Sequence, residues 1–66
     1  MRNRIKIERA INNLTQEDLA KKVGVSRQTI NAMEANKYVP STVLALKIAQ
    51  LFEKPVESIF LLDEDD

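Results

Sequence analysis

The sequence contains no cysteine, no histidine and no tryptophan, and it has a single glycine in 66 residues. The absence of cysteine excludes disulfides and thiolate metal sites, and the absence of histidine removes the commonest metal ligand and general base. Carboxylates alone can serve acid-base chemistry, but a chain this short leaves no cleft able to hold a substrate. We therefore expect no enzymatic activity, no cofactor, no metal and no small-molecule ligand.

Long apolar segments are also missing. The longest apolar run covers residues 59–62, whereas a helix needs about 20 residues to cross a bilayer. The N-terminus lacks the apolar core of a signal peptide, so we expect a cytoplasmic protein without membrane contacts. A chain of this length buries only about 60% of its unfolded surface, and a second subunit would add much to its stability.

Basic and acidic residues are equal in number but unevenly distributed. Residues 1–37 contain eight Lys/Arg and four Asp/Glu, a balance of +4, while residues 38–66 contain two and six, a balance of −4. One half could thus face an anion such as nucleic acid while the other half points away from it. A solvated helix surface with scattered charges explains the same counts equally well.

Apolar residues recur with helical spacing, and no segment alternates in the manner of a strand. Ile7, Ile11 and Leu14 predict a buried stripe on a first helix over residues 4–12, with Asn13 in the left-handed conformation after it.

Two short helices follow, each with a clear start signal. Thr15 and Asp18 resemble a capping box, and Gly24 ends the helix that they begin. Ser26 is a good N-cap for a third helix over residues 27–35. The residues expected to be buried in these two helices are Leu19, Ala20, Val23, Ile30 and Met33.

The C-terminal part begins with a loop over residues 36–40, after which Ser41 caps a fourth helix. The apolar residues at helical spacing in that helix are Val43, Leu44, Ile48, Leu51 and Phe52. Pro55 can occupy the N1 position of a last short helix. The residues of that segment expected to face inward are Val56, Ile59 and Phe60.

The chain end allows two interpretations. Leu61 and Leu62 can extend beside the N-terminal residues as a short β-ribbon, with Arg2 and Arg4 facing the acidic residues 63–66. A frayed, solvated tail fits the sequence equally well.

The most informative segment is residues 16–35, where residues 24–26 alone connect two helices. So short a connection makes the second helix cross the first steeply, which is helix-turn-helix geometry. Ala20 is small where the helices touch, Gly24 allows positive φ in the turn, and branched Ile30 fills the crossing. The pattern is specific for the fold and less so for DNA binding, because some such units serve protein contacts.

The run LTQEDLAKKVGVSRQTINAMEANKYVPSTVLALKIAQLF resembles the Cro/cI-type (XRE) helix-turn-helix family. NKYVPS, ALKIA and PVESIF resemble its smallest stand-alone, dimeric regulators. The resemblance covers nearly the whole chain and implies one all-α, five-helix, lambda-repressor-like DNA-binding domain over residues 1–66. It also implies a dimer formed through residues 55–62, and repression at a palindromic operator.

The resemblance further implies roles for single residues. Gln16 matches a glutamine that typically meets a phosphate, and Asn36 and Lys37 match a loop that contacts the DNA backbone. Arg9 and Glu34 match an ion pair that joins the first helix to the recognition helix. The full set predicted to face DNA is Gln16, Ser26, Arg27, Gln28, Thr29, Asn31, Ala32, Asn36, Lys37 and Tyr38.

The chemistry of the recognition helix agrees with these roles. In the major groove Arg suits guanine and Gln or Asn suits adenine, while Ala32 can contact a thymine methyl. Arg27 is mildly unfavourable at a helix N-terminus, which favours a functional explanation for it and for Gln28. Asn31 is also expected to read bases, although a polar residue on a solvated face needs no explanation.

Other members of the set keep a structural alternative. Thr29 can support the cap of its own helix, and Tyr38 can pack over the fourth helix. Asn36 stands where a glycine is frequent in the family, and Asn tolerates the positive φ required there. Glu8 stands where relatives commonly have a large apolar residue, which leaves the phase of the first helix open.

We expect a homodimeric, sequence-specific regulator that binds double-stranded DNA, with half-sites about one helical turn apart. Its dimer contact should use apolar residues in excess of what a small core can cover. These residues are Pro55, Val56, Ile59, Leu61 and Leu62. The alternative is an antitoxin-like or accessory helix-turn-helix protein that acts mainly by holding another protein.

Overall fold

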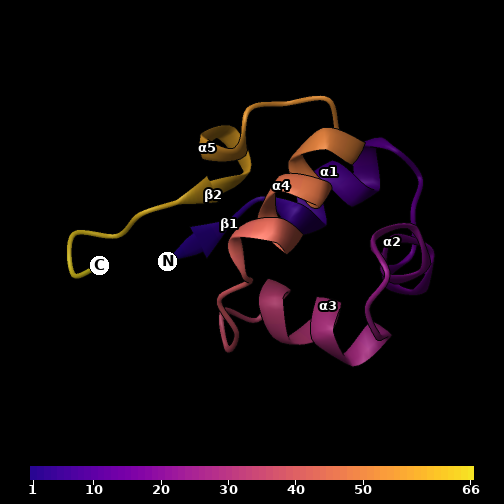
Figure 1. Cartoon of the computed structure of the whole chain (residues 1–66), viewed down its shortest axis with the longest axis horizontal. Helices are drawn as coiled ribbons and strands as arrows, with labels where there is room; N and C mark the ends of the chain where they lie inside the picture. The colour runs from indigo at the N-terminus through magenta and orange to yellow at the C-terminus, as the bar shows by residue number, and fades with distance from the viewer.

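The computed structural model describes residues 1–66 and contains five helices and one small sheet (Figure 1). The helices are α1 (Ile5–Ile11), α2 (Gln16–Val23), α3 (Arg27–Glu34), α4 (Thr42–Leu51) and α5 (Val56–Ile59). Strands β1 (Arg2–Asn3) and β2 (Phe60–Leu61) pair antiparallel. The structure confirms the predicted five-helix fold with a terminal ribbon. None of its helices combines the length and apolar character needed to cross a membrane.

One apolar core holds the helices together. It draws on every helix and on β2, and α2 packs against α3 along the helix-turn-helix unit. All five residues predicted to be buried in α2 and α3 belong to this core. The core residues are Ile5, Leu19, Ala20, Val23, Ile30, Met33, Leu44, Ile48, Ala49, Phe52, Ile59 and Phe60.

Helix starts follow the local sequence signals. The Thr15 hydroxyl accepts the N–H of Asp18 at 3.0 Å, and the Asp18 carboxylate accepts the N–H of Thr15 at 3.0 Å, which completes the capping box. These hydrogen bonds, the backbone one foremost, hold the pKa of Asp18 below its usual value. Ser26 and Ser41 cap α3 and α4 in the predicted way. Gly24 ends α2 with φ +79°.

The predicted inner face of α1 is wrong. Ile7 and Ile11 are 47% and 64% exposed, while Ile5 and Glu8 point into the protein. Glu8 can be buried because its carboxylate accepts a hydrogen bond from the Lys54 ammonium at 2.7 Å. Apolar periodicity assigned the wrong face because a charged residue occupies an inward position and its partner lies far along the chain.

The C-terminal part also departs from the prediction in detail. Val43 lies on the solvent side of α4, whereas Leu44 and Ile48 face the core. Pro55 is the N-cap of α5 rather than its first helical residue.

The C-terminal strand of the ribbon begins one residue earlier than expected. It uses Phe60 and Leu61 instead of Leu61 and Leu62, pairing Arg2 with Leu61. Arg2 reaches Asp63 at 2.8 Å, as expected, but Arg4 forms no ion pair.

Ion pairs also hold the acidic end of the chain in place. The Met1 amine lies 3.1 Å from Asp63 and 3.0 Å from Asp66. Hydrogen bonds to Asp66 and then Asp63 raise the pKa of this amine. The tail is therefore ordered beside β1 and not frayed.

Candidate nucleic-acid interface

Helix α3 presents two chemically different faces. Ile30 and Met33 are fully buried, and the opposite side carries Arg27, Gln28 and Asn31 in exposed positions. Figure 1 shows α3 at the edge of the molecule opposite the α4–α5 connection, directly after the turn that follows α2. A helix held in this way can enter a groove without disturbing the core.

The structure gathers most of the predicted DNA-facing residues around two hollows. Gln28, Thr29, Ala32 and Tyr38 line one of them. The second hollow is lined by Lys6, Arg9, Gln16, Asn31, Glu34 and Ala35. The outward surface of α3 is thus flanked by the loop after it on one side and by the start of α2 on the other.

Two exposed basic side chains on and just after α3 are unpaired, unlike Arg9 on the same side. The cations of the five ion pairs are the Met1 amine, Arg2, Arg9 and Lys54. Arg27 and Lys37 are exposed and form none. The acidic tail lies beside β1, at the side of the molecule opposite α2 (Figure 1). The positive charge near α3 is therefore not neutralised within the chain.

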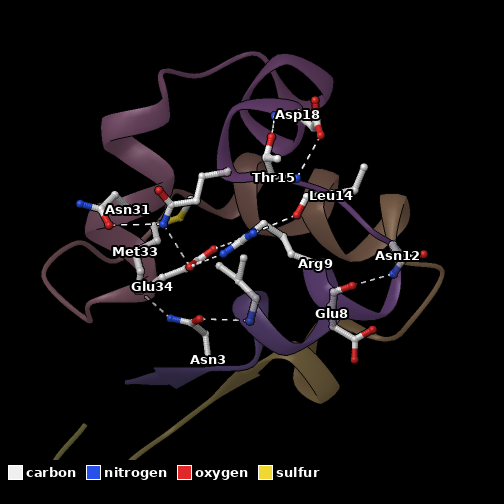
Figure 2. A network of polar contacts seen from close by, with 12 residues as sticks. Asn3, Glu8, Arg9, Asn12, Leu14, Thr15, Asp18, Asn31, Met33 and Glu34 are labelled. Carbon is white, nitrogen blue, oxygen red and sulfur yellow. Dashed lines mark hydrogen bonds and ion pairs between the residues drawn. The ribbon is translucent and has the colours of Figure 1, made fainter.

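The predicted ion pair between Arg9 and Glu34 is present and two-pronged. The Arg9 Nε lies 2.6 Å from Glu34 Oε2 and the Nη2 lies 3.0 Å from Oε1. A third donor, Nη1, bonds the carbonyl of Leu14 at 2.9 Å. The hydrogen bond with Glu34 raises the pKa of Arg9. This pair fixes α1 to the end of α3, as Figure 2 shows.

Gln16 is hydrogen-bonded to two side chains of α3. Its Nε2 donates to Asn31 Oδ1 at 3.3 Å and to Glu34 Oε1 at 3.2 Å. Both amide hydrogens thus have acceptors within the chain. Gln16 links the start of α2 to α3 in this structure, and its contact with a phosphate stays a prediction.

Thr29 and Tyr38 each had a structural role as the alternative to a DNA contact, and the structure shows their surroundings. The Thr29 hydroxyl lies 3.0 Å from that of Ser26, which in turn accepts the Thr29 N–H at 3.1 Å. Thr29 therefore belongs to the cap of α3. Tyr38 is 44% exposed and borders the outward side of α3. Asn36 takes positive φ, as predicted.

Sequence reasoning missed Asn3, which connects the ribbon to the end of α3. Its Nδ2 donates to the Met33 carbonyl at 2.7 Å and to Asn36 Oδ1 at 3.3 Å. Met33 and Asn36 lie 30 and 33 positions after Asn3 in the sequence. No local spacing rule could have revealed this link.

One residue of the expected dimer surface needs a correction. Ile59 is fully buried in the core of its own chain and cannot contact a partner. Nearby lies an apolar groove that includes Val56 but otherwise consists of residues outside the predicted set. Its lining residues are Met1, Val39, Pro40, Thr42, Ala45, Leu46, Val56 and Phe60. The solvent-exposed apolar area therefore extends toward α4 and the loop before it.

An exposed recognition helix that follows a glycine turn and packs across a second helix defines a helix-turn-helix protein. The helix-turn-helix family model matches residues 5–59, and the chain belongs to this family, in its XRE type.

Three relatives are named as uncharacterised HTH-type transcriptional regulators. The one from Methanocaldococcus jannaschii is 58% identical over 66 residues, which covers both chains completely. One from Archaeoglobus fulgidus is 54% identical over 66 residues, covering all of this chain and 93% of that protein. The one from Bacillus subtilis is 46% identical over 66 residues, again over the whole of both chains.

Proposed function

We propose that the protein is a transcriptional repressor that binds a palindromic double-stranded DNA operator as a homodimer. One observation carries the proposal: the outward side of α3 bears exposed Arg27, Gln28 and Asn31 while its inner side is anchored in the core. The names of the relatives agree with a role in transcription.

Base recognition is assigned to the first turn of α3 and to its outward face. Arg27 suits the two acceptors of guanine, and Gln28 suits adenine. Ala32 is partly exposed beside Gln28 and offers a methyl group to thymine. Lys37, Asn36 and Tyr38 follow α3 and are exposed, so they are assigned to phosphates, which position a protein without specifying sequence.

The homodimer is proposed to form through the apolar groove. Val39 and Leu46 are 64% and 53% exposed, and Leu62 is 76% exposed. Val39 and Leu46 line the groove. Exposed apolar surface of this kind marks protein contacts, and a stable interface buries about 800 Å² on each partner. The revised surface keeps Pro55, Val56, Leu61 and Leu62, adds Val39 and Leu46, and omits Ile59.

Selection from random duplexes at two salt concentrations tests the proposal. The wild type should enrich a palindrome, and its affinity should fall steeply as salt rises because phosphate contacts release counterions. Arg27→Ala with Gln28→Ala should abolish the enrichment. Lys47→Ala with Gln50→Ala is the matched control. These two residues are exposed on α4, beside the C-terminal end of α2, and they line neither of the two hollows at α3.

Two outcomes separate the parts of the proposal. If the wild type enriches no sequence and does not bind at low salt, the regulator function is wrong, and the apolar groove becomes the place to search for a protein partner. If a single half-site is enriched and Leu46→Asp leaves the oligomeric state unchanged in sedimentation, DNA binding stands but the dimer surface is wrong.

A further inference from the structure

Two exposed amide side chains on the predicted DNA-facing side form a side-chain hydrogen bond within the protein through only one of their two polar atoms. Asn31 follows Gln28 on the outward face of α3, and Asn36 begins the loop after it. Each accepts one side-chain hydrogen bond through its oxygen, from Gln16 and from Asn3 respectively. An amide nitrogen can only donate and an amide oxygen can only accept, so the end that is free decides which DNA atom each residue can meet.

The orientation of Asn31 follows from a series of contacts that begins at Arg9. A guanidinium group only donates and a carboxylate only accepts, so Glu34 Oε1, which bonds Arg9 Nη2 at 3.0 Å, can face only donors. Gln16 lies 3.2 Å from the same oxygen and must present its NH2 group. That nitrogen is 3.3 Å from Asn31, which must therefore present Oδ1. The NH2 group of Asn31 is left free.

The orientation of Asn36 follows from a second series, which begins at the backbone. Asn3 Oδ1 accepts the Ile5 N–H at 3.2 Å, and Asn3 Nδ2 donates to the Met33 carbonyl at 2.7 Å. Backbone groups cannot exchange donor and acceptor, so the Asn3 amide has one orientation (Figure 2). Its Nδ2 also lies 3.3 Å from Asn36, which must present Oδ1. Again the free end is the NH2 group.

We propose that Gln16 and Asn3 are positioning residues that turn the NH2 groups of Asn31 and Asn36 toward DNA. The proposal rests on the proposed function. Asn36 then suits a phosphate oxygen, which only accepts hydrogen bonds. Asn31 suits acceptors on base edges, namely guanine O6 and N7, adenine N7 or thymine O4, and disfavours the cytosine amino group. This revises the paired contact with adenine, because the Asn31 oxygen is already occupied by Gln16.

The free protein provides a test that needs no DNA. In NMR the side-chain NH2 protons of Gln16 and Asn3 should exchange with solvent more slowly than those of Asn31 and Asn36. Gln50, an exposed glutamine that forms no side-chain hydrogen bond, gives the rate of an unhindered amide. Slow exchange at Asn31 or Asn36 together with fast exchange at Gln16 or Asn3 would reverse the assigned orientation and overturn the inference.

Base selection tests the role of Gln16. Gln16→Ala frees the Asn31 amide to turn over, so discrimination at the base that it contacts should fall roughly three- to tenfold, the equivalent of one hydrogen bond. Gln16→Lys, whose side chain has donors only, should retain the wild-type base preference. Asn31→Asp keeps an acceptor toward Gln16 but offers an oxygen to DNA, and should shift the preference toward an amino group. A purely structural role would lower affinity without changing which base is chosen.

Asn3 is tested through a double-mutant cycle. Asn3→Ala should weaken binding to all duplexes roughly threefold, and it should cost nothing further in an Asn36→Gly background, where the glycine keeps the positive φ. If base preference ignores Gln16→Ala and the two asparagine effects simply add, the inference is wrong while the proposed function stands. If the wild type binds no duplex, the proposed function fails and the DNA-facing role of both amides fails with it, whatever the exchange rates show.

Discussion

Glu8 and Arg9 are neighbours on α1, yet their ion pairs differ in geometry and in the parts of the protein that they join. Arg9 bonds Glu34 through two contacts, and the two side chains are 15% and 7% exposed. Glu8 bonds Lys54 through one contact of 2.7 Å, and the lysine is 44% exposed while the carboxylate is buried. The first pair joins α1 to α3, and the second joins it to the segment between α4 and α5.

The difference shows how one helix can serve two purposes. Arg9 holds the group of residues that includes Glu34, Gln16 and Asn31, so its geometry reaches the surface assigned to DNA. Glu8 and Lys54 form no hydrogen bond or ion pair with any of these residues. We therefore assign the Arg9 pair to the interface and the Glu8 pair to the scaffold.

The largest expected effect is loss of stability when Arg9 is removed. Arg9→Ala leaves Glu34 buried without its partner and should lower the free energy of unfolding by about 3 kcal/mol. Lys54→Ala should cost about 1–2 kcal/mol, because removal of a half-exposed lysine lets water reach Glu8. Urea unfolding followed by circular dichroism measures both, with exposed, unpaired Arg4→Ala as the control. Equal losses for Arg9→Ala and Lys54→Ala would remove the distinction between the two pairs.

Replacing both residues of each ion pair by apolar residues should make the difference in stability between the two pairs clearer. Glu8→Leu with Lys54→Met should leave stability unchanged or raise it, because apolar groups of similar volume often replace a buried ion pair without loss. Arg9→Leu with Glu34→Leu should still cost about 2 kcal/mol, because the Leu14 carbonyl and the Gln16 amide lose their partners. The same urea experiment measures both. A loss for the Glu8 replacement as large as for the Arg9 replacement would contradict the expected difference.

The parts of the fold that sequence alone could predict are those with local causes. The capping box of Thr15 and Asp18, the Ser26 cap and the Gly24 turn each depend on residues within a few positions of one another. The crossing of α2 and α3 follows from them. Local patterns therefore suffice to assign the helix-turn-helix unit and its outward face.

The parts that were missed depend on distant partners. Burial of Glu8 requires Lys54, 46 residues away, and the role of Asn3 requires Met33 and Asn36. Ile59 was assigned to the dimer surface because the pattern cannot show that this residue fills the core. Periodicity identifies a helix, but the face that it buries depends on what packs against it.

Substitutions in the two ion pairs should differ moderately in their effect on DNA affinity. Arg9→Lys cannot form the two-pronged contact, so Glu34 and Gln16 lose their fixed positions, and affinity for the selected operator should fall roughly three- to tenfold. Lys54→Ala should change that affinity less than about twofold. Fluorescence anisotropy at a temperature where both variants are folded measures the difference. Equal weakening by both would mean that α1 supports DNA binding only through overall stability.

The smallest expected effect is on the pH dependence of stability. The contribution of Asp18 must be known before the stabilities of the two ion-pair variants are compared at low pH. The capping box lowers the pKa of Asp18 below its ordinary value of 3.8 in the folded protein. The folded state thus binds this proton less readily than the unfolded state, so the contribution to stability is fully present above pH 3.8 and is lost as pH falls through the lowered pKa. Asp18→Asn should flatten the dependence of unfolding free energy on pH in that window. An unchanged slope in Asp18→Asn would mean that the capping box makes no contribution to the acid sensitivity of the fold.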